Sequence, residues 1–381
     1  MAEVKDIQEY RNKKRKKEKK RTAIKIVAAV LIVAFLVAFV ALYERIFGES
    51  LLETLGFVEP PKGYPVSLTG STPKDILALN EDVALLTDTE IAVYDEYGSL
   101  TVQNGHNCTN PRVRTNQNRA IVYDVGYYSY MLLNGSSVVF GGEHDNQIIS
   151  ANVAQNGNYA IVSASSKYLT ELVVKNKKNT QIASWRSVNN YITAAAFSED
   201  STRIAATGLY SENGLARTTL RILDLKNEQN PVVSDTEFSG SAAIAITYLD
   251  NGNIFILCDD RAIITDFNGE KLFNYEYNGN LYYYNLNRYG AFVICEKDGE
   301  YTATMLYDAK NAGASVKISR EFKTAEHTAT NVYILENDTL TVYDRDFSKV
   351  TEYKNLNDTI GIACGQNQNF LLTFTQIQQI D

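Results

Sequence analysis

The sequence predicts an all-β fold, a β-propeller of eight four-stranded blades preceded by one transmembrane α-helix. Three observations predict this architecture. A long uncharged apolar run follows a strongly basic N-terminus. Beyond Pro61, short β-branched and aromatic segments alternate with turns rich in Asn, Asp and Gly. The same order of segments returns every roughly 36 to 51 residues, which is the spacing of propeller blades.

The apolar run, residues 26–43, reads IVAAVLIVAFLVAFVALY. At ~1.5 Å per residue it forms a helix of roughly 27 Å, enough to cross a bilayer core. It exceeds the ~7–15 residues of a cleavable signal core, and no small-x-small cleavage site follows it. The Lys and Arg residues of 1–25 hold the N-terminus in the cytoplasm. We therefore expect an uncleaved signal anchor in the cell membrane, with the rest of the chain extracellular.

The charge divides sharply along the chain. Residues 1–25 carry eleven Lys or Arg and four Asp or Glu, a balance of about +7, so the remainder carries about −15 against −8 for the whole chain. An acidic exterior portion argues against nucleic acid as a partner, and we expect none. The four cysteines show no CxxC or metal-ligand spacing. Cys258 and Cys295 each end an apolar run and are expected to be small buried hydrophobic residues.

The repeat is clearest where a polar turn precedes a short, almost wholly apolar strand. Such a strand is expected between neighbouring blades, covered on both faces. The turns are 80–82, 116–118, 155–158, 199–201, 250–253, 287–290 and 366–369, with a degenerate copy near 329–331. The strands that follow them are 83–86, 120–123, 159–163, 204–207, 254–258, 291–295, 332–335 and 370–374.

A second detail marks the end of the next strand, where an aromatic residue, Thr or Leu is followed by Asp. The five copies end at Asp95, Asp224, Asp266, Asp308 and Asp344. An Asp at this position is expected to accept hydrogen bonds from the turn backbone and so hold the connection to the outer strand.

Residues 195–207 and 220–225 together resemble one repeat of a WD40-like or TolB-like propeller, although the Trp-Asp and Gly-His signatures of WD40 blades are missing. The basic start, the single anchor, the strand near 63–68 and the repeats are similar to an uncharacterised family of membrane-anchored bacterial propellers from Gram-positive anaerobes. The resemblance covers nearly the entire chain. It implies fold and location, and no assigned activity.

Eight turns predict eight blades, but the last copy lacks an outer strand before Asp381. Residues 66–68 are expected to supply it and to close the ring by pairing the two ends of the propeller. Seven blades is the alternative. The expected organisation is a basic cytoplasmic tail (1–25), the transmembrane helix (26–43), a juxtamembrane stalk (44–62) and the propeller (63–381).

No catalytic or cofactor motif is found. A single Trp, Trp185, does not provide the docking repeats of quinone-dependent dehydrogenases, and the Asp boxes of sialidases are missing. There is no Gly-x-Ser-x-Gly, phosphate-binding loop or zinc spacing. We expect no enzyme activity, no cofactor and no dedicated metal site.

The three histidines are the remaining candidates for cation binding. His106 and His144 are expected in connections from an outer strand to the next inner strand, and His327 at the end of such a connection or just inside the inner strand. With Glu143 and Asp145, the first two could meet around a cation on neighbouring blades.

The same face of a propeller collects the loops from second to third strands. Tyr offers a flat apolar body with a hydrogen-bonding tip, which suits protein or glycan contacts. The expected partner-binding face comprises Tyr127, Tyr128, Tyr168, Arg186, Tyr210, Asp259 and Asp260. Residues 282–284, all Tyr, are instead expected to form an inner strand with alternating burial.

The function expected from these features is a membrane-anchored extracytoplasmic binding or scaffolding module for a protein or cell-envelope component. The first alternative is a lyase or hydrolase of cell-surface glycans. The second is a transmembrane sensor.

Overall fold

The computed structural model describes residues 63–135, 137–227, 229–307 and 313–380. All of them belong to Lys62–Asp381, one of the two units into which the chain divides. The predicted tail, transmembrane helix and stalk, and Asp308, lie outside the described residues. Within the described ranges, no helix has the length and hydrophobicity to cross a bilayer.

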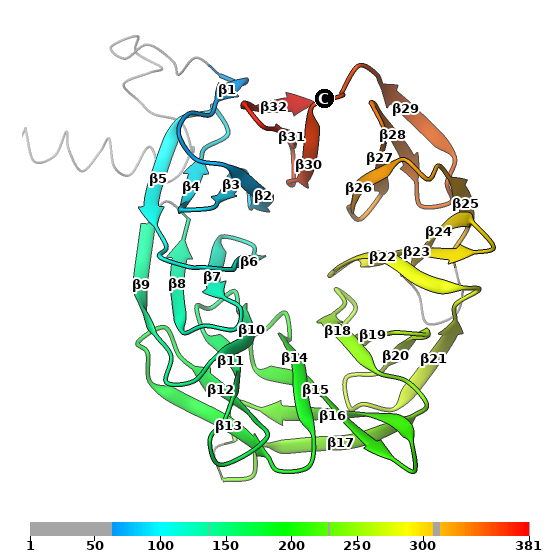
Figure 1. Ribbon diagram of the computed structural model, residues 1–381. Helices are drawn as coiled ribbons and strands as arrows, with labels where there is room; N and C mark the ends of the chain where they lie inside the picture. Colours follow the sequence, from blue (N-terminus) through cyan, green and yellow to red (C-terminus); the bar gives the residue numbers. More distant parts are fainter. Residues whose placement is uncertain (1–62, 136, 228, 308–312, 381) are drawn as a thin grey trace, which may run out of the picture. The chain divides into compact units, whose positions relative to one another are not determined.

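Eight four-stranded antiparallel sheets surround a central channel, so the eight-bladed propeller is confirmed (Figure 1). The inner strands are β2 (Pro73–Leu79), β6 (Pro111–Asn116), β10 (Ile148–Val153), β14 (Tyr191–Phe197), β18 (Ala243–Tyr248), β22 (Asn280–Asn287), β26 (Phe322–His327) and β30 (Thr359–Cys364). The second strands are β3 (Asp82–Thr87), β7 (Arg119–Asp124), β11 (Tyr159–Ala164), β15 (Arg203–Glu212), β19 (Ile254–Cys258), β23 (Gly290–Lys297), β27 (Asn331–Glu336) and β31 (Asn369–Thr373).

The two remaining positions of each blade lie toward the outside of the ring. The third strands are β4 (Glu90–Tyr94), β8 (Ser129–Asn134), β12 (Thr170–Lys175), β16 (Leu215–Asp224), β20 (Arg261–Thr265), β24 (Glu300–Leu306), β28 (Thr339–Asp344) and β32 (Gln376–Ile380). The outer strands are β5 (Leu100–Gly105), β9 (Ser137–Glu143), β13 (Gln181–Ser187), β17 (Val232–Ser239), β21 (Lys271–Glu276), β25 (Ser315–Ile318), β29 (Lys349–Tyr353) and β1 (Val66–Ser67).

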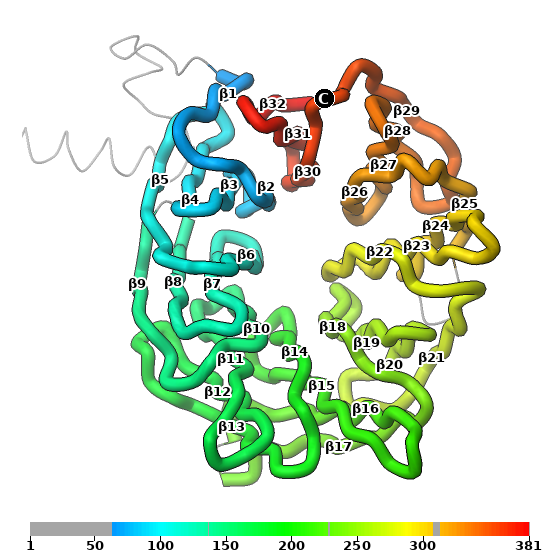
Figure 2. The backbone as a smooth tube through the Cα atoms, in the orientation of Figure 1, coloured from blue at the N-terminus to red at the C-terminus, as the bar shows by residue number. Residues whose placement is uncertain are grey.

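The two ends of the propeller close the ring, as the sequence predicted. Val66 pairs with Ile377 and Ser67 with Gln376, so β1 becomes the outer strand of the blade built from β30, β31 and β32. Figure 2 shows the first and last described strands side by side. Closure removes the unpaired sheet edge, and it excludes the seven-blade alternative.

The core lies between blades rather than within them. Each of eight clusters of buried side chains joins two neighbouring blades. The second strands form the centre of the core, because each of their two faces packs against a neighbouring blade. All five residues of β19, for example, are buried. Cys258 and Cys295 are buried here, as expected.

The repeated Asp is confirmed as a turn brace at the four copies that the structure describes. Asp95 and Asp344 accept hydrogen bonds from backbone N–H groups of the following turn. Asp224 accepts one such bond. Asp266 accepts two, from Asn268 and Glu270, both at 2.9 Å. The carboxylate thus satisfies turn donors that the ladder leaves free.

The substitution Asp266→Ala should lower the free energy of unfolding by about 1 kcal/mol, because two turn N–H groups lose their acceptor. Chemical denaturation measures the loss. The control is Glu270→Ala in the same turn, whose exposed side chain should be neutral. Equal effects of the two substitutions would contradict a bracing role for Asp266.

Candidate functional site

The antiparallel meander gives the ring two different faces. One face carries the loops from second to third strands and from each outer strand to the next inner strand, and we call it the connection face. The opposite face carries the turns between first and second strands, and we call it the turn face. The inner strands line the channel and run from the connection face to the turn face. The channel has one mouth on each face.

The predicted tyrosines lie on the connection face. Tyr127 and Tyr128, between β7 and β8, are 45% and 43% exposed. Tyr168 lies in the loop between β11 and β12, and the Arg186 guanidinium is 6.0 Å from its ring centroid. Arg186 also forms an ion pair with Glu171 at 2.7 Å. These residues belong to two neighbouring blades.

The other residues predicted for this face are on other blades. Tyr210 lies on β15, in the long hairpin with β16. Asp259 accepts a hydrogen bond from the Ala242 N–H at 2.8 Å. Asp260 forms an ion pair with Arg261 at 2.7 Å. The two aspartates thus already have local partners.

The histidine cluster is not assembled. His106 is buried; its Nδ1 accepts from the Cys108 N–H at 3.0 Å, and its Nε2 lies 3.1 Å from the Thr87 carbonyl oxygen. The His144 Nε2 lies 3.0 Å from the Ser163 hydroxyl, and burial lowers the His144 pKa. Among the described residues, Glu143 and Asp145 included, no three His, Cys, Asp or Glu side chains group as metal ligands would.

The predicted position of His327 is wrong. β26 begins at Phe322, so His327 is its last residue and lies at the turn face. The sequence places this inner strand poorly because the turn that follows, 329–331, is the degenerate copy of the repeat.

A set of exposed apolar side chains at the mouth of the connection face was not predicted from the sequence. Ile149, Ile244 and Tyr282 each lie at a β-bulge near the start of an inner strand, between Ile148 and Ser150, Ala243 and Ala245, and Leu281 and Tyr283. A bulge leaves one residue without a ladder partner and turns its side chain out of the regular alternation. No sequence periodicity marks such a position.

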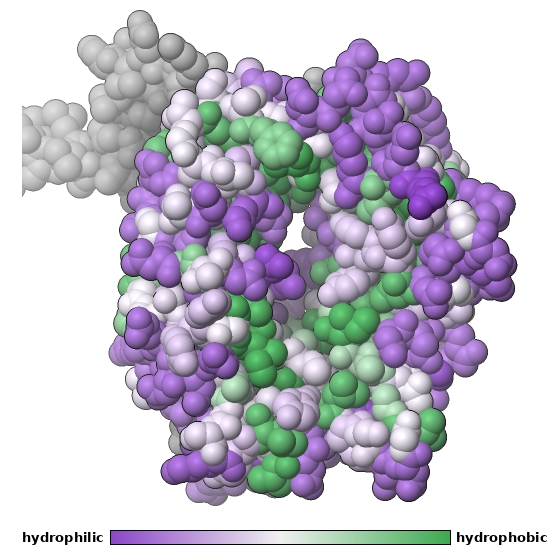
Figure 3. Space-filling model, in the orientation of Figure 1, coloured by the Kyte–Doolittle hydropathy of each residue, from purple (hydrophilic) through white to green (hydrophobic). Residues whose placement is uncertain are grey.

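Tyr191, the first residue of β14, completes this set at 56% exposure. We call Ile149, Tyr191, Ile244 and Tyr282 the apolar arc, since they belong to four consecutive blades. Figure 3 shows hydrophobic side chains gathered around the channel over β10, β14, β18 and β22.

Three of the remaining four blades place basic side chains at the corresponding positions, and the fourth, β30, has the half-buried Ile360 there. Lys74 and Lys323 lie at the bulges of β2 and β26, and Arg112 at the equivalent place on β6. All three are exposed, and the Lys323 Nζ donates to the Asn357 carbonyl at 2.7 Å. We call them the basic arc. The mouth of the connection face is therefore apolar on one side and basic on the other.

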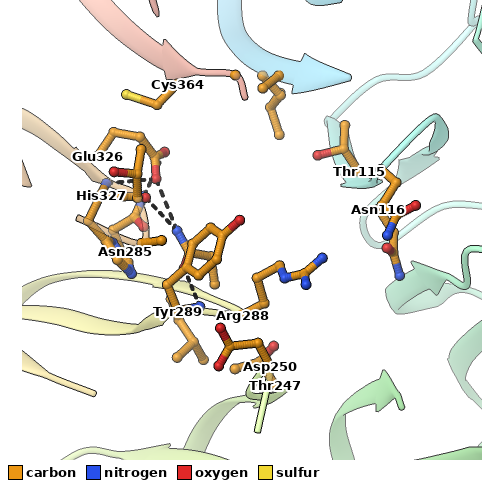
Figure 4. Close-up of a pocket in the computed structure, with 18 of the residues that line it drawn as sticks. Thr115, Asn116, Thr247, Asp250, Asn285, Arg288, Tyr289, Glu326, His327 and Cys364 are labelled. Atoms are coloured by element: carbon orange, nitrogen blue, oxygen red, sulfur yellow. Dashed lines mark hydrogen bonds between the residues drawn. The ribbon is translucent and has the colours of Figure 1, made fainter. Parts of the chain in front are cut away.

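A cavity of about 920 Å³ occupies the channel at the turn face. Its wall is formed by the last residues of the inner strands and by the turns that follow them. Figure 4 shows Glu326 and His327 on one wall, Thr115 and Asn116 across from them, and Arg288 reaching between. Tyr284 also lines the cavity; Tyr282 and Tyr284 are exposed and Tyr283 is half-buried, as expected for an alternating inner strand.

Glu326 is the titratable centre of this cavity. Its carboxylate accepts hydrogen bonds from the His327 N–H at 3.0 Å and the Asn285 amide at 3.1 Å. Burial raises the pKa of Glu326 to about 7; these bonds oppose the rise, and repulsion from Asp75 adds to it. Burial likewise raises the pKa of Asp75, against the attraction of Arg114 and Arg112.

Because the folded pKa of Glu326 exceeds the unfolded value, the folded chain binds more protons between about pH 4.5 and 7, and this group's contribution to stability falls as pH rises through that window. Relative to wild type, Glu326→Gln should therefore gain about 2 kcal/mol between pH 5 and pH 8. Denaturation at the two pH values measures the gain. A pH-independent difference between the two proteins would refute the raised pKa.

The comparison with protein families decides the classification. A family model described as a family of unknown function (DUF5711) matches residues 63–381. The chain belongs to this family. No curated protein matches this DUF5711 sequence.

Several solved structures are similar to the DUF5711 propeller. BamB from Moraxella catarrhalis has a TM-score of 0.53 and 10% identity, over 84% of this chain and 98% of its own. The C-terminal WD40 domain of Sif2 has a TM-score of 0.58 and 10% identity, over 84% and 99%. Apo AztD from Citrobacter koseri has a TM-score of 0.55 and 10% identity, over 85% and 93%. Such likeness shows the fold alone.

The expected membership of an uncharacterised propeller family is thus confirmed for DUF5711. The membrane anchor and the Gram-positive source that the resemblance implies stay predictions.

Proposed function

We propose that this chain is a membrane-anchored recognition module whose propeller holds a protein partner on its connection face, outside the cytoplasm. The apolar arc carries the proposal. Exposed apolar or aromatic side chains on four consecutive blades lie at the connection-face ends of the inner strands, and two of them are Tyr. A contiguous exposed apolar patch with aromatic anchors is typical of protein-binding surfaces.

The surroundings of the apolar arc define the partner's chemistry. The basic arc lies across the channel, and Tyr127, Tyr128 and Tyr168 lie farther out on the same face. A partner that inserts apolar side chains against the apolar arc and sets carboxylates against the basic arc would complement both halves of the mouth. The exposed Tyr127 and Tyr128 and the half-buried Tyr168 would form the rim of the interface, where amphipathic side chains are favoured.

The location rests on the N-terminal sequence. The basic segment 1–25 and the apolar run 26–43 support an uncleaved anchor with the propeller outside. A closed, rigid ring at the membrane surface suits recognition, because it presents many loops without rearrangement.

Two potential catalytic groups of the turn-face cavity, Cys364 and His327, are held in unreactive forms by burial. Burial raises the pKa of the Cys364 thiol, so the thiolate needed for nucleophilic attack is disfavoured. Burial lowers the His327 pKa to about 3, and its Nε2 is engaged by the Gly290 carbonyl at 3.1 Å. Neither group is poised to activate a nucleophile.

In-cell crosslinking of the full-length protein, followed by affinity purification and mass spectrometry, tests the proposal. Replacing Tyr191 and Ile244 by Asp should reduce recovery of the partner at least ~10-fold, about 1.4 kcal/mol. The matched control replaces Leu272 and Val350 by Asp, which are similarly exposed but lie on outer strands. Partner recovery that is equal in both double variants would overturn the site.

A further inference from the structure

Two arginines of the inner strand β6 lie along the channel without an anionic partner. Arg112 and Arg114 are both exposed, and because they are two residues apart their side chains lie on the same side of the strand. The Arg112 Nη1 donates to the carbonyl of the preceding Pro111 at 3.3 Å. Among the described residues, neither guanidinium forms an ion pair. Two like charges about 7 Å apart repel each other, so their presence side by side calls for an explanation.

The other charges of the channel do not fully neutralise this pair. Asp75 lies in the field of both arginines, which opposes the rise that burial causes in its pKa, but it forms no ion pair with either. Arg288, which lines the same cavity as Arg114, is paired with Glu199 at 2.9 Å. Burial raises the pKa of Glu326 to about 7, so this carboxyl is partly protonated at neutral pH and repels an anion only in part. The two arginines of β6 are therefore available to an anionic ligand.

The positive charge of the channel stands out in an acidic part of the chain. Residues beyond 25 carry a strong net negative charge. Nevertheless, Lys74 and Lys323 of the basic arc join Arg112 at the connection-face mouth. Such a cluster attracts an anionic segment toward the mouth. Figure 3 shows the channel open through the middle of the ring, so the segment has a path from the mouth to Arg114.

The wall across the channel from the arginines is apolar and aromatic. β22 is the fourth inner strand after β6 in a ring of eight, so the two strands lie on opposite sides of the channel (Figure 1). Tyr284 on β22 is 36% exposed and Ala245 on β18 is half-buried, and both line the cavity together with Arg114. The side chains of an extended peptide alternate between two opposite sides, and those on one side repeat about every 7 Å. A peptide of alternating acidic and apolar residues would therefore present carboxylates to β6 and apolar side chains to β22.

We propose that the protein partner inserts an extended acidic segment into the channel from the connection face and pairs its carboxylates with Arg112 and Arg114. This inference rests on the proposed function and names the part of the partner that the channel accepts. A guanidinium binds carboxylates and phosphates alike through two parallel hydrogen bonds. The opposite wall favours the peptide, because a polyphosphate has no apolar group to set against Tyr284 or Ala245. The volume of about 920 Å³ lies within the range of cavities that enclose a ligand.

Fluorescence anisotropy of the full-length protein in detergent tests the proposal with a labelled hexapeptide of alternating Leu and Glu. We expect a Kd on the order of 0.1 mM or tighter. Replacing both Arg112 and Arg114 by Gln should weaken binding at least ~10-fold. The matched control replaces Lys177 and Lys178 by Gln, which removes the same charge from the exposed turn between β12 and β13. It should change the Kd by less than about 2-fold, because salt screens such distant charges.

Further probes test the sign and the spacing of the charges. A hexapeptide of alternating Leu and Lys should not bind. A hexapeptide of three Leu followed by three Glu should bind at least ~10-fold more weakly, because its carboxylates do not share one side. No binding of the alternating Leu and Glu peptide at millimolar concentration, or equal losses in the two double variants, would overturn the proposal. Tighter binding of tripolyphosphate than of the peptide would overturn the ligand class.

Partner capture in cells separates this inference from the proposed function. The arginine double variant should recover at least ~10-fold less partner than the lysine control. If it recovers as much partner while the Tyr191→Asp, Ile244→Asp variant recovers little, the connection face binds the partner and insertion into the channel is wrong. If neither variant loses the partner, the proposed function fails as well.

Discussion

The substitution Phe370→Ala should lower the free energy of unfolding of the propeller by about 3–5 kcal/mol, the usual cost of removing a fully buried aromatic ring. Phe370 lies on β31 and is fully buried. Its side chain belongs to the cluster that joins the last blade to the first, and its ring centroid is 4.9 Å from that of Tyr64. The loss in free energy of unfolding therefore measures how strongly packing at the junction between the last and first blades stabilises the propeller.

Phe374→Ala is the matched control. Phe374 follows the same strand but is 60% exposed, so its loss should lie within about 0.5 kcal/mol of zero. Urea denaturation of residues 62–381, monitored by circular dichroism, gives both values. A loss below 1 kcal/mol for Phe370→Ala would contradict a ring sealed by the N-terminal strand.

The second large effect is acid destabilisation through His327. Burial lowers the pKa of His327 to about 3, and the nearby Arg345 lowers it further, against the Gly290 carbonyl. Between pH 6.5 and 3 the unfolded chain binds more protons, so stability is lost as pH falls below 6.5. At about 1.4 kcal/mol per pH unit, the loss from this residue between pH 6.5 and 5 is about 2 kcal/mol.

His327→Gln removes the titration and keeps an N–H that can donate to Gly290. The variant should be less stable than wild type at pH 7, and the gap should shrink by about 2 kcal/mol at pH 5. Glu326→Gln provides a comparison at the neighbouring residue. Its stability relative to wild type also changes with pH, because the substitution removes a carboxyl with a raised pKa. A gap for His327→Gln that stays constant from pH 7 to pH 5 would show that the pKa of His327 is not lowered in the folded chain.

The fold could be predicted because every blade of a propeller has the same order of strands and turns, which appears in the sequence as a repeat. Each second strand is buried on both faces, and its continuous apolar run survives even where the turn before it degenerates, as at Val332. The closing strand at Val66 could be predicted because the last copy of the repeat was one strand short. Turn braces such as Asp266 follow from local hydrogen bonding alone.

The side chains that meet at the two mouths of the channel could be predicted only in part. Which inner-strand side chains enter the channel depends on bulges, and a bulge such as that at Ile244 leaves no periodic trace. The cavity depends on residues far apart in sequence, such as Asn116 and Glu326, meeting across the ring. The sequence did predict tyrosines on the connection face, where Tyr127 and Tyr128 lie, but not the apolar arc beside them.

The most direct test of the account is partner capture by the full-length protein in cells, compared between wild type, the Tyr191→Asp, Ile244→Asp double variant, and the Leu272→Asp, Val350→Asp control. We expect one protein to be crosslinked to wild type and control alike and to be depleted at least ~10-fold in the first double variant. A partner recovered equally from all three, or no enriched protein with wild type, would contradict recognition through the connection face.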